Sequence, residues 1–206
     1  MLELRNVKKL YNKRLILEIP FLQLDGGIYW IKGANGSGKT TLLRMIAGLI
    51  PFEGEITFNK ANLKDSPLAY RRSVSWAEAE PLFPTFLTGM ELVVLYQGIR
   101  KAAPAEAEEL LTRFAMGDYI HSPVGSYSAG MMKKLSLVLA FLGTTPVVIL
   151  DEPLITLDEG SLATVCELIA ERSARALFLM SSHQEPQTGL LPAGKELIVN
   201  HQTIFN

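Results

Sequence analysis

Residues 33–41 constrain the fold of this chain more than any other segment. They read Gly-Ala-Asn-Gly-Ser-Gly-Lys-Thr-Thr and match the pattern G-x-x-x-x-G-K-[ST] without substitution. Glycines in such a loop let the backbone turn tightly and direct successive N–H groups at an anion. The pattern therefore predicts a phosphate-binding loop, which needs a strand before it and a helix after it.

The sequence on either side of the loop has this order. Residues 28–31, Ile-Tyr-Trp-Ile, are typical of a buried strand, and residues 40–47 are compatible with a helix that ends before Gly48. Lys39 supplies a positive charge for the outer phosphates of a nucleotide, and the Thr40 hydroxyl suits Mg²⁺. We expect the phosphates to contact Gly33, Ala34, Asn35, Gly36, Ser37, Gly38, Lys39, Thr40 and Thr41.

The rest of the chain predicts an α/β fold of the P-loop NTPase type. Alternating apolar residues in 2–7 and 15–19, with a further strand at 55–58, predict an antiparallel β subdomain at the N-terminus. Residues 90–99 and 105–116 have the pattern of helices. We expect a helical subdomain, inserted at about 82–145, within a single domain that spans residues 1–206.

Strands and helices alternate again after Pro146. Residues 147–150 and 176–180 are typical of buried strands, with a helix between them at 161–172. This alternation predicts a mostly parallel core sheet, and residues 196–205 are suited to a terminal hairpin.

Composition excludes several classes of protein. Twenty Lys and Arg residues against 21 Asp and Glu leave no basic footprint for nucleic acid. The only cysteine, Cys166, cannot form an internal disulfide and is expected to be buried, as in a reducing cytosol. The N-terminus lacks the pattern of a signal peptide, and the apolar segment 135–150 is too short to span a membrane. An apolar content of 48% still leaves room for a docking surface.

Two adjacent carboxylates follow the apolar strand 147–150. Asp151 and Glu152 stand where open α/β sheets bind ligands, at the carboxyl end of a strand. We expect Asp151 to share Mg²⁺ with Thr40, and Glu152 to polarise the water that attacks the γ-phosphate. Together with the phosphate loop, the acidic pair predicts Mg²⁺-dependent hydrolysis of a nucleoside triphosphate.

Further motifs occur in a fixed order along the chain. Residues 126–135, Ser-Tyr-Ser-Ala-Gly-Met-Met-Lys-Lys-Leu, include a Ser-x-Gly element that opens a helix, and Leu157-Asp158 and His183 follow the acidic pair. In this order the chain resembles the ATP-binding subunits of ABC transporters over essentially its whole length. Tyr-Ser-x-Gly-Met in place of Leu-Ser-Gly-Gly-Gln is similar to the variant of exporter-type ATPases.

The resemblance implies roles for residues outside the phosphate loop. Ser128 and the Gly130 backbone would contact the γ-phosphate of an ATP held by the opposite subunit, so two sites would form in a homodimer. His183 would contact the γ-phosphate of its own subunit, and Tyr11 would stack on the adenine. Leu157-Asp158 would link the two sites, although Asp158 could equally be a simple helix cap.

The sequence departs from the family pattern at one position. ABC ATPases usually have Gln in a loop ahead of the helical subdomain, where it binds Mg²⁺ and senses the membrane partner. This chain has Ala79 there, between Glu78 and Glu80. Either glutamate could replace the missing ligand, or water could.

These observations predict the ATP-binding and ATP-hydrolysing subunit of an exporter. A separate transmembrane permease subunit would hold it at the cytoplasmic, inner face of the cell membrane, and the chain would reach the membrane only through that partner. A haem-exporter-like subunit is an alternative, as is a soluble ABC ATPase that acts on nucleic acid or ribosomes. The last class lacks support, because the chain has no sustained heptads, second cassette or basic arms. A non-catalytic ATP-binding module is disfavoured by the presence of Lys39, Asp151, Glu152 and His183.

Overall fold

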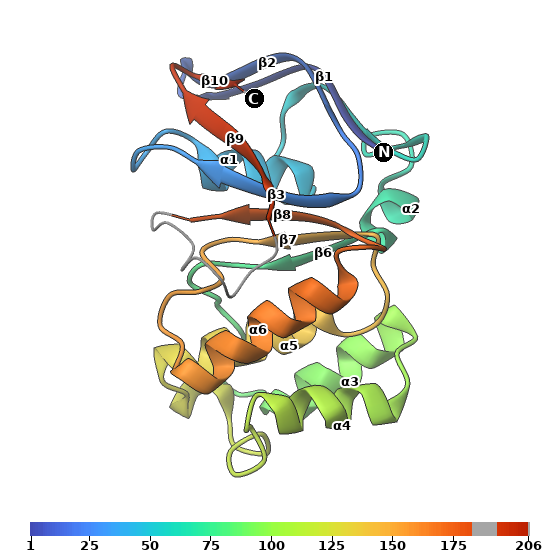
Figure 1. Ribbon diagram of the computed structural model, residues 1–206, viewed down its shortest axis with the longest axis vertical. Coiled ribbons are helices and arrows are strands. Elements are labelled where there is room, and N and C mark those ends of the chain that lie inside the picture. Colours follow the sequence, from blue (N-terminus) through green and yellow to red (C-terminus); the bar gives the residue numbers. More distant parts are fainter. Residues whose placement is uncertain (183–192, 206) are drawn as a thin grey trace.

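The computed structural model describes residues 1–182 and 193–205, which form two stacked β-sheets with helices between and below them (Figure 1). The strands are β1 (Leu2–Tyr11), β2 (Arg14–Leu24), β3 (Gly27–Lys32), β4 (Glu53–Phe58), β5 (Ala61–Asn62), β6 (Val74–Ala77), β7 (Val147–Leu150), β8 (Leu177–Ser181), β9 (Lys195–Asn200) and β10 (Thr203–Phe205). The helices are α1 (Lys39–Ile46), α2 (Pro67–Arg72), α3 (Gly89–Arg100), α4 (Pro104–Arg113), α5 (Ala129–Phe141) and α6 (Glu159–Arg172), with a 3₁₀ turn at Val124–Ser126.

The larger sheet has the strand order β10-β9-β3-β8-β7-β6, and only β10 runs antiparallel to its neighbour. Both of its faces are buried. Ile28 and Trp30 of β3 pack with the helices α3 to α6, whereas Tyr29 and Ile31 pack with α1 and the other sheet. Because successive side chains of a strand point to opposite faces, a strand covered on both sides is a continuous apolar run.

The smaller sheet, β2-β1-β4-β5, is antiparallel and lies above α1 (Figure 1). On the other side of the larger sheet, α5 and α6 lie against the strands, and α3 and α4 lie below them (Figure 1). The start of α3 is fixed by a capping box: Glu91 N donates to Thr88 Oγ1 at 3.1 Å, and Thr88 N donates to the Glu91 carboxylate at 2.7 Å. The expected fold class, with an antiparallel subdomain, a mostly parallel core and a helical insertion, is confirmed.

The structure corrects several expected boundaries. The helix expected at 161–172 begins at Glu159, since Asp158 is its N-cap, and the helix expected at 105–116 ends at Arg113. The terminal hairpin and the burial of Cys166 are confirmed. The short elements α2 and β6 were not predicted. Within the described residues, every helix falls short of the length and apolar character needed to cross a bilayer.

Candidate active site

The phosphate loop joins the end of β3 to the start of α1 and has conformations that favour glycine. Gly38 is the N-cap of α1 and has a φ of 110°, in the left-handed region where a Cβ is strained. Gly33 has a φ of 152°, and a Cβ there would collide with the backbone carbonyl of Val199 in β9. The loop is therefore shaped by its glycines and ends at a helix N-terminus, which favours an anion.

Lys39 is the first residue of α1 and is 5% exposed. Its Nζ donates to the carbonyl oxygens of Gly33 at 2.8 Å and Ala34 at 3.1 Å, both in the same loop. Burial lowers the pKa of Lys39, and the nearby carboxylates of Glu152 and Asp151 oppose this shift. The ammonium group is thus held inside the phosphate loop before any ligand arrives.

The acidic pair meets the loop at the carboxyl end of β7. Thr40 Oγ1 donates to Asp151 Oδ1 at 3.2 Å, and Ser181 Oγ donates to the same oxygen at 2.6 Å. Asp151 is 1% exposed, and its Oδ2 has no hydrogen-bond partner in the part of the chain that the structure describes. A buried carboxylate oxygen without a partner is costly, and a hard cation that prefers oxygen ligands would satisfy it. Thr40 and Asp151 therefore fit a Mg²⁺ site.

Glu152 follows Asp151 in an unusual conformation. Its φ is 48°, a left-handed value that costs a non-glycine residue on the order of 1–3 kcal/mol. Its backbone N–H donates to Ser181 Oγ at 2.9 Å, so Ser181 holds both acidic residues in place. Sequence reasoning missed Ser181, although a polar residue at the end of the strand beside β7 was a signal for it.

Tyr11 lies beside the phosphate loop. A cavity of about 260 Å³ is lined by Tyr11, Ile16, Gly36, Gly38, Lys39, Thr40 and Thr41. Tyr11 is 46% exposed, and Lys9 Nζ lies 4.5 Å from the centre of its ring. One cavity is therefore lined both by an aromatic ring, which can stack on a base, and by a loop that can bind phosphates, and a nucleotide has both of these parts.

Ser128 and Gly130 belong to a different surface, since the described residues that line this cavity include neither. Ser128 is the exposed N-cap of α5, and its Oγ accepts a hydrogen bond from Met131 N at 3.2 Å. The expected roles of Ser128 and Gly130 therefore need a ligand from outside this subunit. His183 lies outside the described residues.

The turn at Leu157-Asp158 is tied to α5. Lys134 Nζ lies 2.6 Å from Asp158 Oδ2, and Asp158 Oδ1 accepts a hydrogen bond from Ser161 N at 2.8 Å. The Lys134 hydrogen bond, followed by that from the Ser161 N–H, lowers the pKa of Asp158 to about 2. Asp158 is thus a helix cap, and it also joins the acidic loop to the start of α5.

The segment that should carry the missing glutamine comes directly after β6. The Glu78 carboxylate accepts a hydrogen bond from Arg44 of α1, and the Glu80 side chain is exposed. The carbonyl oxygens of Glu78 and Ala79 both accept hydrogen bonds from Lys133 Nζ, at 3.0 and 3.3 Å. Glu78 is therefore already engaged by a cation in this structure.

Lys133 was missed by the sequence analysis. Its Nζ also donates to the Asp151 carbonyl at 2.9 Å, and the residue is fully buried. Burial lowers the pKa of Lys133 to about 8, while Asp151, Glu152 and Glu78 act in the opposite direction. Next to Lys134, it has the pattern of a solvated charge on a helix, so the sequence held no signal for its role.

Comparison with known proteins places these features in context. Residues 22–155 match the family model described as ABC transporter. The cytochrome c biogenesis ATP-binding export proteins CcmA of Yersinia pestis and Legionella pneumophila are 30% and 33% identical, over 90% and 85% of this chain and 87% and 88% of theirs. A solved structure of an ATP-binding subunit of an ABC transporter is 28% identical with a TM-score of 0.89, covering 99% of this chain and 88% of that one.

Proposed function

The chain belongs to the ABC transporter family as one of its ATP-binding, ATP-hydrolysing subunits, and we propose that it powers export through a separate membrane subunit. The observation that carries the site assignment is the hydrogen bond from Thr40 to Asp151. It joins the phosphate loop to the acidic pair, which lies 111 residues further along the chain. Phosphate binding and hydrolysis thereby share one edge of the sheet.

In this proposal each residue at the edge has a separate task. The loop N–H groups and Lys39 hold the phosphates, and Tyr11 stacks on the adenine. Thr40 and Asp151 hold Mg²⁺, which when bound would neutralise charge on the phosphate oxygens. Glu152 orients the attacking water and accepts its proton, a role suited to a carboxylate fixed beside the loop.

We propose that the complete site requires two copies of this chain. Ser128 Oγ and the backbone of Gly130 are presented at the N-terminus of α5, where a helix favours negative charge. Because Ser128 is exposed and outside its own subunit's cavity, the γ-phosphate of a second subunit's ATP is the ligand that suits it. ATP would close the homodimer and hydrolysis would reopen it.

The membrane subunit would dock beside the helical subdomain, on the cytoplasmic face of the membrane. Large apolar side chains are exposed along one stretch, from the loop after β6 to the end of α3: Leu82, Phe86, Val94, Leu95 and Ile99. Leu82 and Phe86 are 88% and 80% exposed, which is costly unless a partner covers them. Val94→Asp with Ile99→Asp should abolish co-purification with the membrane subunit, and Leu68→Asp on α2 is the matched control. Equal retention of the partner by both variants would contradict this docking surface.

A haem-exporter-like subunit is the second candidate, and it is compatible with the two relatives named as cytochrome c biogenesis ATP-binding export proteins. It differs from the general proposal only in cargo and partner. Identification of the membrane subunit that co-purifies with this chain separates the two candidates.

The experiment that tests the function is an ATPase assay of the purified chain, with and without RNA, DNA or the membrane subunit. We expect Mg²⁺-dependent hydrolysis that nucleic acid leaves unchanged and the membrane subunit alters. Stimulation by RNA or DNA alone would favour the soluble class of ABC ATPases. ATP binding without any hydrolysis, in the presence of the membrane subunit, would contradict the enzyme assignment.

A further inference from the structure

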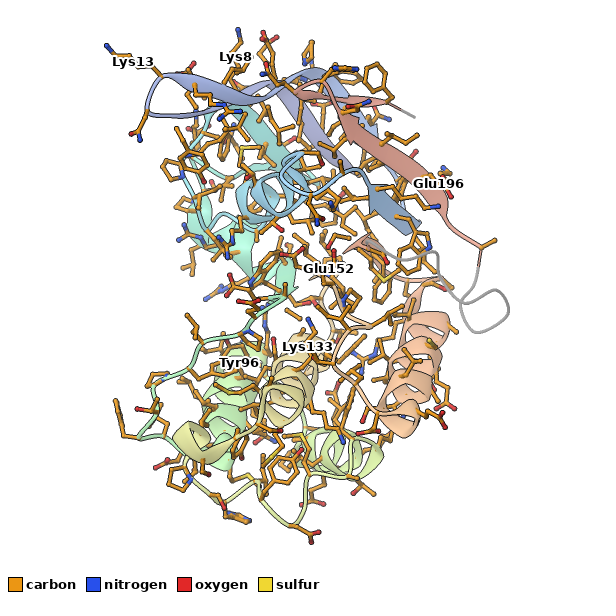
Figure 2. All side chains as sticks on the ribbon, turned by 90° about the vertical axis from the view of Figure 1, so that its left-hand side faces the viewer. Lys8, Lys13, Tyr96, Lys133, Glu152 and Glu196 are labelled. Carbon is orange, nitrogen blue, oxygen red and sulfur yellow. The ribbon has the colours of Figure 1, made fainter. Side chains whose placement is uncertain are left out.

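Lys133 is a buried cation that the catalytic proposal does not use. It lies one turn after the start of α5, and its side chain reaches the level where the helices meet the strand ends, near Glu152 (Figure 2). Its Nζ donates to three backbone carbonyls, those of Glu78, Ala79 and Asp151, at 3.0, 3.3 and 2.9 Å. An ammonium group has three donors, so this set of acceptors matches its capacity.

The cost of burying Lys133 indicates that these bonds matter. The residue has no exposed surface, and burying an ammonium group is expensive unless it is hydrogen-bonded and near opposite charge. Glu78, Asp151 and Glu152 supply that charge. Removal of the ammonium would leave three backbone acceptors in a poorly hydrated space without their donor.

The three carbonyls belong to parts of the chain with different tasks. Asp151 directly follows β7 and begins the acidic pair, whereas Glu78 and Ala79 directly follow β6 and begin the segment that leads into the helical subdomain. The side chain of Glu78 is held separately, by Arg44 of the helix that follows the phosphate loop. The segment 78–79 is therefore fixed through its backbone by α5 and through its side chain by α1.

We propose that Lys133 is a positioning residue for ATP hydrolysis, which ties segment 78–79 and α5 to the strand end that carries Asp151. The inference rests on the proposed function, because it assigns the acidic pair to the reaction. In this arrangement one buried side chain joins the first part of α5, which Ser128 caps, to the backbone of Asp151. The hydrogen bonds of Lys133 thus link the helical subdomain to the acidic pair, and one of their acceptors is the carbonyl of Ala79, at the position of the missing glutamine.

Arg100 provides a matched control, because it is a helix residue that bonds backbone carbonyls at the opposite end of β6. It lies at the end of α3, and its guanidinium donates to the carbonyls of Val74 at 2.8 Å and Arg72 at 3.4 Å. It thus joins the helical subdomain to the start of β6, whereas Lys133 joins it to the segment after the end of β6. Both cations bond backbone carbonyls, but only Lys133 does so at the edge of the sheet that carries the acidic pair.

The test compares Lys133→Met, Lys133→Gln and Arg100→Met with the wild-type chain. For Lys133→Met we expect turnover to fall roughly 10- to 100-fold, the effect of a small misplacement of catalytic groups. Its affinity for a fluorescent ATP analogue should stay within about twofold of wild type, because the phosphate loop is untouched. Hydrogen exchange should accelerate at the amides after β6, near residues 78–80. Arg100→Met should leave turnover and this exchange unchanged, even if it lowers the melting temperature.

Lys133→Gln keeps two amide donors, so we expect an intermediate loss of turnover, and this variant carries the test if Lys133→Met does not fold. Wild-type turnover in Lys133→Gln, or an equal loss in Arg100→Met, would overturn the inference. An equal loss of ATP affinity and turnover in Lys133→Met would also overturn it, since the role would then be general stability. A Lys39→Ala control in the same assays that binds ATP normally would instead contradict the proposed function.

Discussion

The phosphate loop and the contacts of Lys133 present the same interaction in two settings. In both, a buried lysine donates to backbone carbonyls. Lys39 bonds to residues five and six positions before it, all within one loop, whereas Lys133 bonds to residues 18, 54 and 55 positions away. The first lysine is held by its own motif, and the second holds separate segments together.

The difference indicates what each lysine can do. The acceptors of Lys39 are loop carbonyls, and phosphate oxygens are stronger acceptors for an ammonium group, so a nucleotide can take their place. The acceptors of Lys133 directly follow two neighbouring strands, β6 and β7, so loss of these hydrogen bonds would loosen the sheet edge. Lys39 is therefore suited to bind a ligand, and Lys133 is suited to hold backbone segments in place. The following substitutions test this difference between the ligand-binding groups and the groups that position them.

The largest effect should come from Glu152→Gln. Gln is close in size but cannot accept the proton of water, so turnover should fall roughly 10²- to 10⁴-fold with ATP affinity retained. Because ATP is then not hydrolysed, the closed dimer should accumulate, and size-exclusion chromatography with light scattering would detect it.

The control for this trapped dimer is the double variant Glu152→Gln with Ser128→Arg, in which the larger side chain obstructs the contact at the start of α5. It should remain monomeric with ATP. A monomeric single variant at saturating ATP, or a double variant that dimerises equally well, would contradict a site shared between two subunits.

Tyr11→Ala should weaken ATP binding by about 1–3 kcal/mol, the range measured for base stacking on aromatic side chains. Turnover at saturating ATP should change little, because the substitution leaves Asp151 and Glu152 unchanged. Tyr11→Phe keeps the ring and is the control. If Phe weakens binding as much as Ala, the hydroxyl and not the ring face makes the contact, and stacking is wrong.

A smaller effect, on the Mg²⁺ requirement, is expected from substitutions beside the position of the missing glutamine. Since Arg44 engages the Glu78 carboxylate and Glu80 is exposed, we expect water to take the ligand's place at Ala79. Glu78→Ala and Glu80→Ala should therefore each shift the Mg²⁺ concentration for half-maximal hydrolysis by less than about twofold. A marked rise in only one variant would show that this glutamate replaces the glutamine.

The smallest effect should be on stability, at Asp158. Its pKa is lowered to about 2 from the usual 3.8, so it stabilises the fold above pH 3.8, and this contribution is lost as the pH falls toward 2. The side chain is 57% exposed, which limits its contribution to about 1 kcal/mol or less. Asp158→Asn keeps the helix cap but removes the charge. In urea titrations, its difference from wild type should shrink from pH 7 to pH 3, and a difference that grows would contradict this.

The contrast between contacts within one motif and contacts between distant segments also explains which features could be predicted from the sequence. The phosphate loop, the strand before the acidic pair and the glycine after α1 depend on neighbours in sequence, and the structure has them where they were expected. The sequence predicted that Asp151 and Thr40 share Mg²⁺, from the rule that ligands bind at the carboxyl ends of strands, and the structure joins the two side chains by a hydrogen bond.

Contacts between distant segments were not predictable in this way. Ser181 had a weak signal in its position at a strand end. Lys133 and Arg44 had none, because each belongs to a helix whose pattern is compatible with a solvated charge. Only the packing of α5 and α1 against the sheet shows which backbone groups they meet.

Lys39 and Lys133 should respond differently to the same substitution, because we expect Lys39 to bind the nucleotide and Lys133 to position the groups around it. Equilibrium titration of Lys39→Met and Lys133→Met with the same fluorescent ATP analogue tests it with one substitution at two sites. We expect Lys39→Met to lose affinity by about 10²-fold, since a charge-assisted contact to phosphate is removed, and Lys133→Met to bind within about twofold of wild type. Equal losses in the two variants, or normal binding by Lys39→Met, would contradict the account.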